Sequence, residues 1–225
     1  MRPLSNRRRG SLLAVGLVLA FSVFLAGCAQ RSTLPGWRLF PRSEGGLIAQ
    51  NELVWASGHT WGRADVHQAL LAATAHLQDQ YPGSKVGILH VSLRKGGLFP
   101  PHLSHRAGND VDVVYLGRWV GTGAWFPQRP HPFLLGYSIK YGAKGRHGLL
   151  ELDLARNWCF LMGLRRQRSA RVQKIFVEPF LEELLLAEGR RLGATSAELA
   201  WASSTLRYAG DNALDHKDHM HIRFE

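Results

Sequence analysis

Apolar residues along the chain follow two kinds of spacing. In one kind they recur three and four positions apart, which predicts amphipathic helices. In the other they form short runs rich in β-branched residues, which predicts strands. Helices are expected at residues 65–80, 153–164, 179–188 and 194–208. Strands are expected at residues 85–93, 111–116, 171–177 and 218–224. Helices mixed with strands without regular alternation indicate an α+β fold, in which helices pack on a small sheet.

Two stretches carry neither pattern. Residues 29–46 are rich in Gln, Arg, Ser, Pro and Gly, a composition typical of a spacer. Residues 117–150 are rich in Gly, Pro, Trp and His and allow no assignment, and a stretch this long without structure is usually functional or mobile. The length from residue 47 to residue 225 suits one domain with one core.

The N-terminus has the pattern of an export signal. Four arginines are followed by an almost wholly apolar run over residues 11–26. The sequence Leu25-Ala26-Gly27-Cys28 resembles the bacterial lipoprotein box, in which the cysteine is lipidated and becomes the first residue. The alternative is an uncleaved anchor, since the run approaches the roughly 17 residues that span a bilayer. We expect residues 1–27 to be a lipoprotein signal peptide and residues 28–46 a lipidated tether. The protein would then lie in the periplasm, tethered through Cys28, and at the outer membrane if the host is Gram-negative.

The chain is basic, with 28 Lys and Arg against 17 Asp and Glu and a net charge of +11. Removing residues 1–27 takes away four arginines, which leaves +7. This charge suits anionic partners such as lipid head groups or cell-wall polymers, although solubility alone also explains it. Nucleic acid is not expected, because export separates the chain from it. With Cys28 lipidated, Cys159 remains alone in an apolar helical stretch, so we expect a buried, inert thiol and no intrachain disulfide.

Histidines and aspartates form two compact groups. The first group comprises His102, His105, Asp110 and Asp112. The second comprises His216, Asp218, His219 and His221. Neutral imidazoles and a carboxylate are ligands of catalytic zinc, which keeps a fourth position for water. The two groups together therefore predict a metal site, whereas the remaining histidines are interpreted as structural or exposed: His59, His67, His76, His90, His131 and His147.

The alternation of side chains along a strand predicts which of these residues point to the same face. His219 and His221 are two positions apart, so they share one face of the predicted strand, and one can bind metal while the other reaches substrate. Asp218 should point away unless a bulge intervenes. Asp110 and Asp112 likewise alternate with Val111, and only one of the two carboxylates need bind the metal, while the other orients a neighbouring group.

Both groups resemble segments of the penicillin-insensitive murein endopeptidases. These enzymes belong to the superfamily of lysostaphin-type peptidases, D-Ala-D-Ala metallopeptidases and hedgehog domains (LAS-type). The resemblance spans roughly residues 47–224 and is carried by Ser104-His105-x₄-Asp110-Val111-Asp112 and His216-x₂-His219-Met220-His221-Ile222-Arg223. The sequences Asp153-Leu154-Ala155-Arg156-Asn157-Trp158 and Ile175-Phe176-Val177-x-Pro179 add to it. It departs from the family at Pro100-Pro101 and over residues 117–150.

The resemblance implies a small antiparallel sheet flanked by helices and Zn²⁺ bound by His105, Asp112 and His221. It implies catalytic roles for His102, His216 and His219 near the metal, with Asp110 and Arg223 supporting the ligands. The expected function is zinc-dependent hydrolysis of peptide cross-links in peptidoglycan, insensitive to penicillin because no serine nucleophile is used. The alternatives are a carboxypeptidase that removes a terminal D-Ala and a non-catalytic lipoprotein that binds the wall or stores metal. The sequence names no protein partner.

Overall fold

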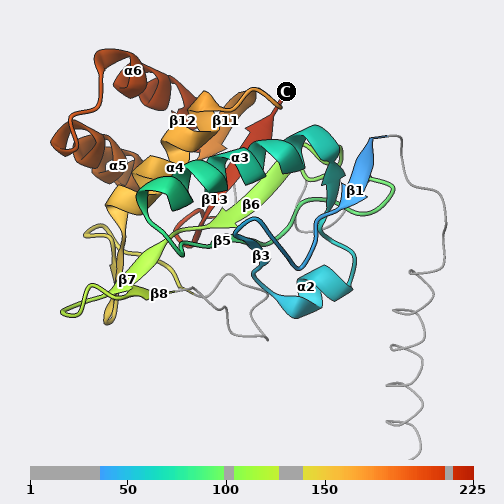
Figure 1. Cartoon of the computed structure of the whole chain (residues 1–225), viewed down its shortest axis with the longest axis horizontal. Coiled ribbons are helices and arrows are strands. Elements are labelled where there is room, and N and C mark those ends of the chain that lie inside the picture. The colour runs from blue at the N-terminus through green and yellow to red at the C-terminus, as the bar shows by residue number, and fades with distance from the viewer. Residues whose placement is uncertain (1–35, 99–103, 127–138, 211–214) are drawn as a thin grey trace, which may run out of the picture. The chain divides into compact units, whose positions relative to one another are not determined.

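The structure is a computed structural model that describes residues 36–98, 104–126, 139–210 and 215–225. Mixed helices and sheets confirm the α+β class (Figure 1). The helices are α2 (Glu52–Ala56), α3 (Ala64–Gln80), α4 (Leu154–Arg166), α5 (Pro179–Arg191) and α6 (Ser196–Thr205). Among the described residues, no helix is both long enough and apolar enough to cross a bilayer.

The main sheet has seven strands in the order β12-β11-β13-β6-β5-β3-β2. Its strands are β2 (Ser43–Glu44), β3 (Leu47–Ala49), β5 (Val86–Ile88), β6 (Asp110–Val114), β11 (Val172–Phe176), β12 (Leu206–Arg207) and β13 (His219–Phe224). The four central strands run antiparallel, but β3 pairs with β5 and β11 pairs with β12 in parallel. The sheet is therefore mixed, which corrects the expectation of an antiparallel sheet.

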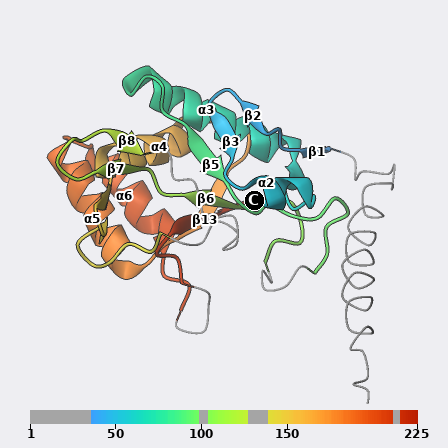
Figure 2. The same ribbon diagram turned by 90° about the horizontal axis from the view of Figure 1, so that it is seen from below.

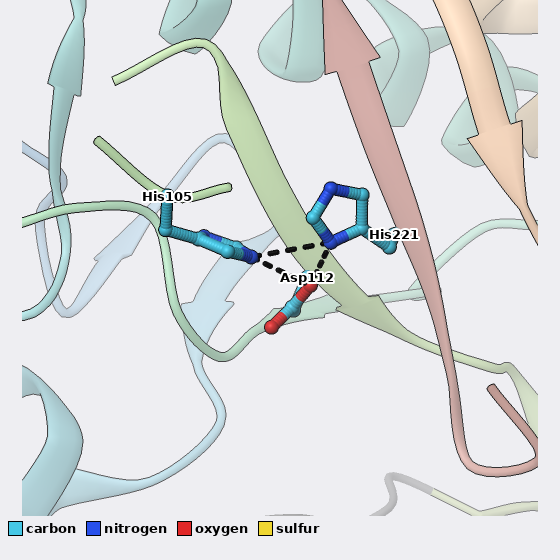
Figure 3. Close-up of side chains that lie close together, drawn as sticks. All are labelled: His105, Asp112 and His221. Atoms are coloured by element: carbon cyan, nitrogen blue, oxygen red, sulfur yellow. Dashed lines mark hydrogen bonds and ion pairs between the residues drawn. The ribbon is translucent and has the colours of Figure 1, made fainter. Parts of the chain in front are cut away.

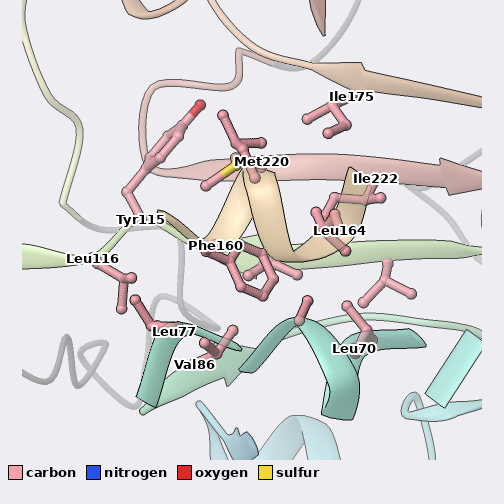
Figure 4. Close-up of a cluster of buried hydrophobic side chains, with 14 of the residues drawn as sticks. Leu70, Leu77, Val86, Tyr115, Leu116, Phe160, Leu164, Ile175, Met220 and Ile222 are labelled. Atoms are coloured by element: carbon pink, nitrogen blue, oxygen red, sulfur yellow. The ribbon is translucent and has the colours of Figure 1, made fainter. Parts of the chain in front are cut away.

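The core lies between this sheet and the helices. Leu70 and Leu77 of α3 and Phe160 of α4 are buried against Met220 and Ile222 of β13 (Figure 4). Each fully buried side chain of this size contributes about 1.5–3 kcal/mol relative to exposure. Because side chains alternate along a strand, Asp112 and His221 face the opposite side of the sheet. The hydrophobic face thus fixes which polar residues are gathered on the other face.

The sequence explains where α4, α5 and α6 begin. Asp153 accepts a hydrogen bond from the backbone N–H of Arg156 and so caps α4. Pro179 occupies the first turn of α5, where no backbone N–H is needed. Thr195 and Glu198 form a reciprocal capping box at the start of α6.

Cys159 is a free, buried cysteine, and burial raises the pKa of its thiol.

The region expected to be a tether is folded in part. β1 (Trp37–Leu39) pairs with β4 (Trp61–Arg63), and β2 pairs with β3. Ordered structure therefore begins before residue 47, because the aromatic and apolar residues around Trp37 make a strand in a sequence of otherwise spacer-like composition. Cys28, the expected lipidation site, and the expected signal peptide lie outside the described residues.

Short strands lie within residues 117–150, where the sequence predicts no helix or strand. β7 (Gly117–Trp119), β8 (Trp125–Phe126), β9 (Arg146–His147) and β10 (Leu150–Leu152) form a second sheet in the order β8-β7-β10-β9. Figures 1 and 2 both show β7 and β8 beyond the end of β6. These strands are only two or three residues long, too short for a hydrophobic period to be visible in the sequence.

The predicted strand 85–93 is shorter than expected. β5 ends at Ile88, and the following backbone bonds to another segment: the N–H of Val91 donates to His59 O at 2.8 Å. This turn away from the sheet brings Val91 beside the functional site described next. The other expected elements lie within three residues of their predicted bounds.

Candidate metal centre

Three buried side chains meet on the polar face of the main sheet: His105, Asp112 and His221 (Figure 3). His105 Nε2 lies 3.2 Å from His221 Nδ1 and 3.2 Å from Asp112 Oδ1. The third side of the triangle, from His221 Nδ1 to Asp112 Oδ1, measures 3.0 Å. This group could hold a metal ion.

The triangle has the size that a tetrahedral metal requires. Zinc–nitrogen and zinc–oxygen bonds of 2.0–2.1 Å at the tetrahedral angle separate two ligand atoms by about 3.3 Å. The three observed separations are slightly shorter, so small movements would admit an ion. Two imidazoles and one carboxylate suit zinc, although imidazole also suits other transition metals. The residues therefore fit a metal, and the donor set does not decide which one.

Strand register places two of the three donors. His221 of β13 is directly opposite Asp112 of β6 in an antiparallel pair, so both side chains project from the same face. His105 comes from the loop before β6. Its Nδ1 lies 2.8 Å from the carbonyl of Val91, and because a carbonyl only accepts, this nitrogen carries the proton. Nε2 of His105 therefore keeps a lone pair, which faces the other two potential metal-ligand atoms, Nδ1 of His221 and Oδ1 of Asp112.

Asp110 orients His221 from the side away from the triangle. Its Oδ1 lies 2.9 Å from His221 Nε2 and accepts a second hydrogen bond, of 2.7 Å, from Arg223 Nε. A carboxylate behind a ligand histidine fixes the ring and its tautomer, so Nδ1 of His221 is the atom presented to a metal. Arg223 also lies over the ring of Phe176, with Cζ 5.5 Å from the ring centre.

The electrostatics of the group favour a cation. Burial opposes ionisation of Asp112, but the adjacent His105 and His219 hold its pKa well below the usual range. Burial alone would lower the pKa of His221, yet its hydrogen bonds to Asp110 and Asp112 raise it to about 9. In the metal-free protein at neutral pH, a proton on His221 therefore occupies the place of the cation.

His219 lies at the edge of this group and is held by its neighbour Asp218. Nδ1 of His219 is 2.6 Å from Oδ1 of Asp218, so it donates its proton to the carboxylate. Nε2 then faces the site, 3.7 Å from Asp112 Oδ1. Asp218 does not point away as expected, because it precedes the first residue of β13 and strand alternation does not apply to it.

His216 completes the row of imidazoles. Its ring centre is 5.1 Å from that of His219 and 5.9 Å from that of His221. Burial, together with the imidazoles of His219 and His221, lowers its pKa to about 4, so it is neutral at pH 7. Glu178 accepts a hydrogen bond of 2.9 Å from the backbone N–H of His216, and Tyr115 donates one of 3.0 Å to its carbonyl.

The structure brings together most of the residues that the sequence suggested. His105, Asp112, His221, Asp110, Arg223, His219 and His216 lie in one group, whereas His102 lies outside the described residues. Sequence reasoning missed Glu178 and Tyr115, which hold the main chain of His216, and the carbonyl of Val91. A main-chain acceptor leaves no signal in the sequence. For Glu178 the sequence contains only a weak signal, which is its position directly before Pro179, the first residue of α5.

No protein-family model matches the chain, and no curated protein matches its sequence significantly. The functional argument therefore depends on the geometry of the site.

Proposed function

We propose that this protein is a zinc-dependent metallopeptidase that hydrolyses peptide cross-links in peptidoglycan. The observation that carries the proposal is the buried triangle of His105, Asp112 and His221 with a further imidazole, His219, directed at its edge. Three protein donors leave a tetrahedral metal one open position, which is typical of catalytic rather than structural sites. Zinc in this position would activate water and polarise the scissile carbonyl.

The side chains around the triangle have complementary roles. Asp218 holds His219 in the tautomer whose Nε2 faces the site, so this nitrogen can accept a proton or donate one to the leaving group. When protonated, His219 stabilises negative charge that develops on the substrate. His216 is neutral at pH 7, so it serves as a hydrogen-bonding and positioning group rather than a fixed cation.

The choice of peptidoglycan as substrate has other support. The sequences around His105 and His221 resemble murein endopeptidases of the LAS type, and the N-terminus has the pattern of a lipoprotein signal. Export would carry the enzyme to the compartment that holds the cell wall, and lipid on Cys28 would tether it to the membrane. The basic composition suits an anionic polymer.

The test is digestion of purified sacculi by the full chain in detergent, with and without a chelator, and identification of the fragments by mass spectrometry. We expect chelator-sensitive conversion of cross-linked dimers to monomers. His221→Ala should abolish it, whereas His76→Ala, a substitution in α3 outside the site, should not. Release of terminal D-Ala without loss of dimers would indicate a carboxypeptidase. Stoichiometric metal binding without any released fragment would contradict enzymatic function.

A further inference from the structure

A pocket lies apart from the metal centre. It has a volume of 390 Å³ and is formed by the C-terminal end of α4, the start of β11 and one side of α6. Val172 lines it, whereas Phe176, four residues further along β11, packs against His216 and His221. Four residues of a strand span about 13 Å, so the pocket is distinct from the site of the proposed hydrolysis.

Arginine dominates the charged lining of this pocket. Arg165, Arg168 and Arg171 contribute to it, and the lining includes no acidic residue. Arg171 forms an ion pair of 3.4 Å with Glu225, but the Arg171 side chain is 79% exposed, so solvent weakens this pair. Within the part of the chain that the structure describes, neither Arg165 nor Arg168 pairs with an acidic side chain. The pocket therefore carries uncompensated positive charge.

The helix dipole explains only one of these arginines. Arg165 lies in the last turn of α4, where a cation stabilises the partial negative charge of the helix end. Arg168 and Arg171 lie beyond that end, so this benefit does not extend to them. Three like charges around one hollow repel one another, and a bound anion would remove this repulsion.

The pocket is also more than a cluster of charges. Trp201 of α6 supplies an aromatic wall, and Ser204 and Thr205 add hydroxyl groups. Gln167 fixes the turn that carries Arg168: its Oε1 accepts from the backbone N–H groups of Ser169 at 2.8 Å and Ala170 at 3.2 Å. The volume falls in the range of about 300–1,000 Å³ that is usual for small-molecule sites.

We propose that this pocket binds a phosphate ester. Guanidinium groups present paired N–H donors that match the oxygens of a phosphate, and several of them balance its charge better than that of a single carboxylate. The aromatic wall and the remaining volume would take the organic part of the ester. Such an ester can be the headgroup of a phospholipid or a soluble phosphate compound, and the two sources share the same recognition chemistry.

The experiment is calorimetric titration of the full chain in zwitterionic detergent. One arm uses glycerol 1-phosphate, and the other uses mixed micelles containing phosphatidylglycerol, with micelles of a detergent that carries no phosphate group as the reference. The test variant is R165Q/R168Q. Its control, R190Q/K85Q, removes the same charge from two exposed residues outside the pocket. R165K/R168K keeps the charge but loses the forked geometry, and thermal unfolding checks that each variant is folded.

We expect binding at one site per chain, weakened about tenfold or more in R165Q/R168Q, less in R165K/R168K and little in the control. Binding of glycerol 1-phosphate would indicate a soluble ester, and binding in the phosphatidylglycerol arm alone would indicate a lipid headgroup. Absence of binding in both arms would overturn the proposal. Equal weakening in R165Q/R168Q and R190Q/K85Q would also overturn it, because the attraction would then be diffuse.

Discussion

Asp110 and His221 form a hydrogen bond of 2.9 Å behind the triangle of metal donors. The bond engages Nε2 of the imidazole and leaves Nδ1 facing His105 and Asp112. Arg223 in turn donates to the same Asp110 oxygen at 2.7 Å. The orientation of one ligand therefore depends on a pair of residues that do not themselves touch the metal position.

Asp110→Asn tests this dependence. The amide cannot act as a charged acceptor for both His221 and Arg223, so we expect zinc affinity to fall about 10–100-fold while the fold persists. Competition with a chromogenic chelator measures the affinity. Asp79→Asn, on the surface of α3, is the control and should bind zinc as the unchanged protein does. Equal affinities for the Asp110 variant and the control would contradict the role given to Asp110.

Zinc binding should release a proton at neutral pH. His221 has a pKa of about 9 in the metal-free fold, above its ordinary value of 6.5, and the metal takes the nitrogen that holds this proton. The metal should displace about one proton from His221 per zinc near pH 7 and almost none well above pH 9, and the zinc-bound water should give up a further proton as pH rises through about 7. Above about pH 8, where that water is already ionised, the total count should therefore fall by nearly one proton as pH rises through about 9. Calorimetry in buffers of different ionisation enthalpy measures the number. A count that does not fall over this range would exclude His221 Nδ1 as a ligand.

The same pKa predicts how the stability of the metal-free protein changes with pH. Because the folded pKa of His221 is raised, its protonation stabilises the fold fully below pH 6.5, and this contribution is lost as pH rises through about 9. Denaturant unfolding of chelator-treated protein should therefore show a decline over this window. His221→Gln, which cannot be protonated, should show a smaller decline. Parallel declines in both proteins would place the titrating group elsewhere.

Asp218→Asn separates metal binding from catalysis. The amide can no longer accept the Nδ1 proton as a carboxylate does, so the tautomer of His219 is no longer fixed. We expect the rate of cross-link cleavage to fall about 10²–10⁴-fold with zinc affinity nearly unchanged. Asp215→Asn, which alters an exposed pair with Lys140, is the control. A parallel loss of zinc would show that Asp218 acts on the metal site instead.

Part of this architecture could be predicted from the sequence, and the reasons differ by element. Long helices such as α3 and α4 can be predicted from the sequence because many apolar positions repeat on one face. The alternation of Met220 and Ile222 with His219 and His221 assigns one side to the core and the other to the site. The two groups of histidines and aspartates could therefore be expected to meet, although the sequence could not supply distances.

Other features depend on contacts that a local pattern does not encode. The strands near Trp37 and those between Gly117 and Leu152 are too short to show a period, and tertiary pairing forms them. Asp218 lies one residue before β13, so the exact end of that strand decided its orientation. Glu178 and Tyr115 form hydrogen bonds with the backbone of His216, from which they are far apart in the sequence, so only the tertiary fold brings them together.

Gly163 marks the closest approach of α3 and α4. A Cβ added there would lie 2.7 Å from the carbonyl oxygen and 2.8 Å from the Cα of Ala73, so the two backbones must separate. Gly163→Ala should lower the free energy of unfolding by about 1–3 kcal/mol, although alanine favours helix more than glycine does. Denaturant unfolding measures the change. Gly142→Ala, whose added Cβ meets only an ordinary contact at 3.7 Å, is the control.

A crystal structure of the zinc-loaded protein, with anomalous data collected at the zinc edge, tests the central claim most directly. The account predicts one zinc ion bound by His105 Nε2, a carboxylate oxygen of Asp112 and His221 Nδ1, with no fourth protein ligand. Zinc bound at other residues would contradict the assigned centre. A fourth bond from His219 would close the coordination sphere and contradict a hydrolytic role.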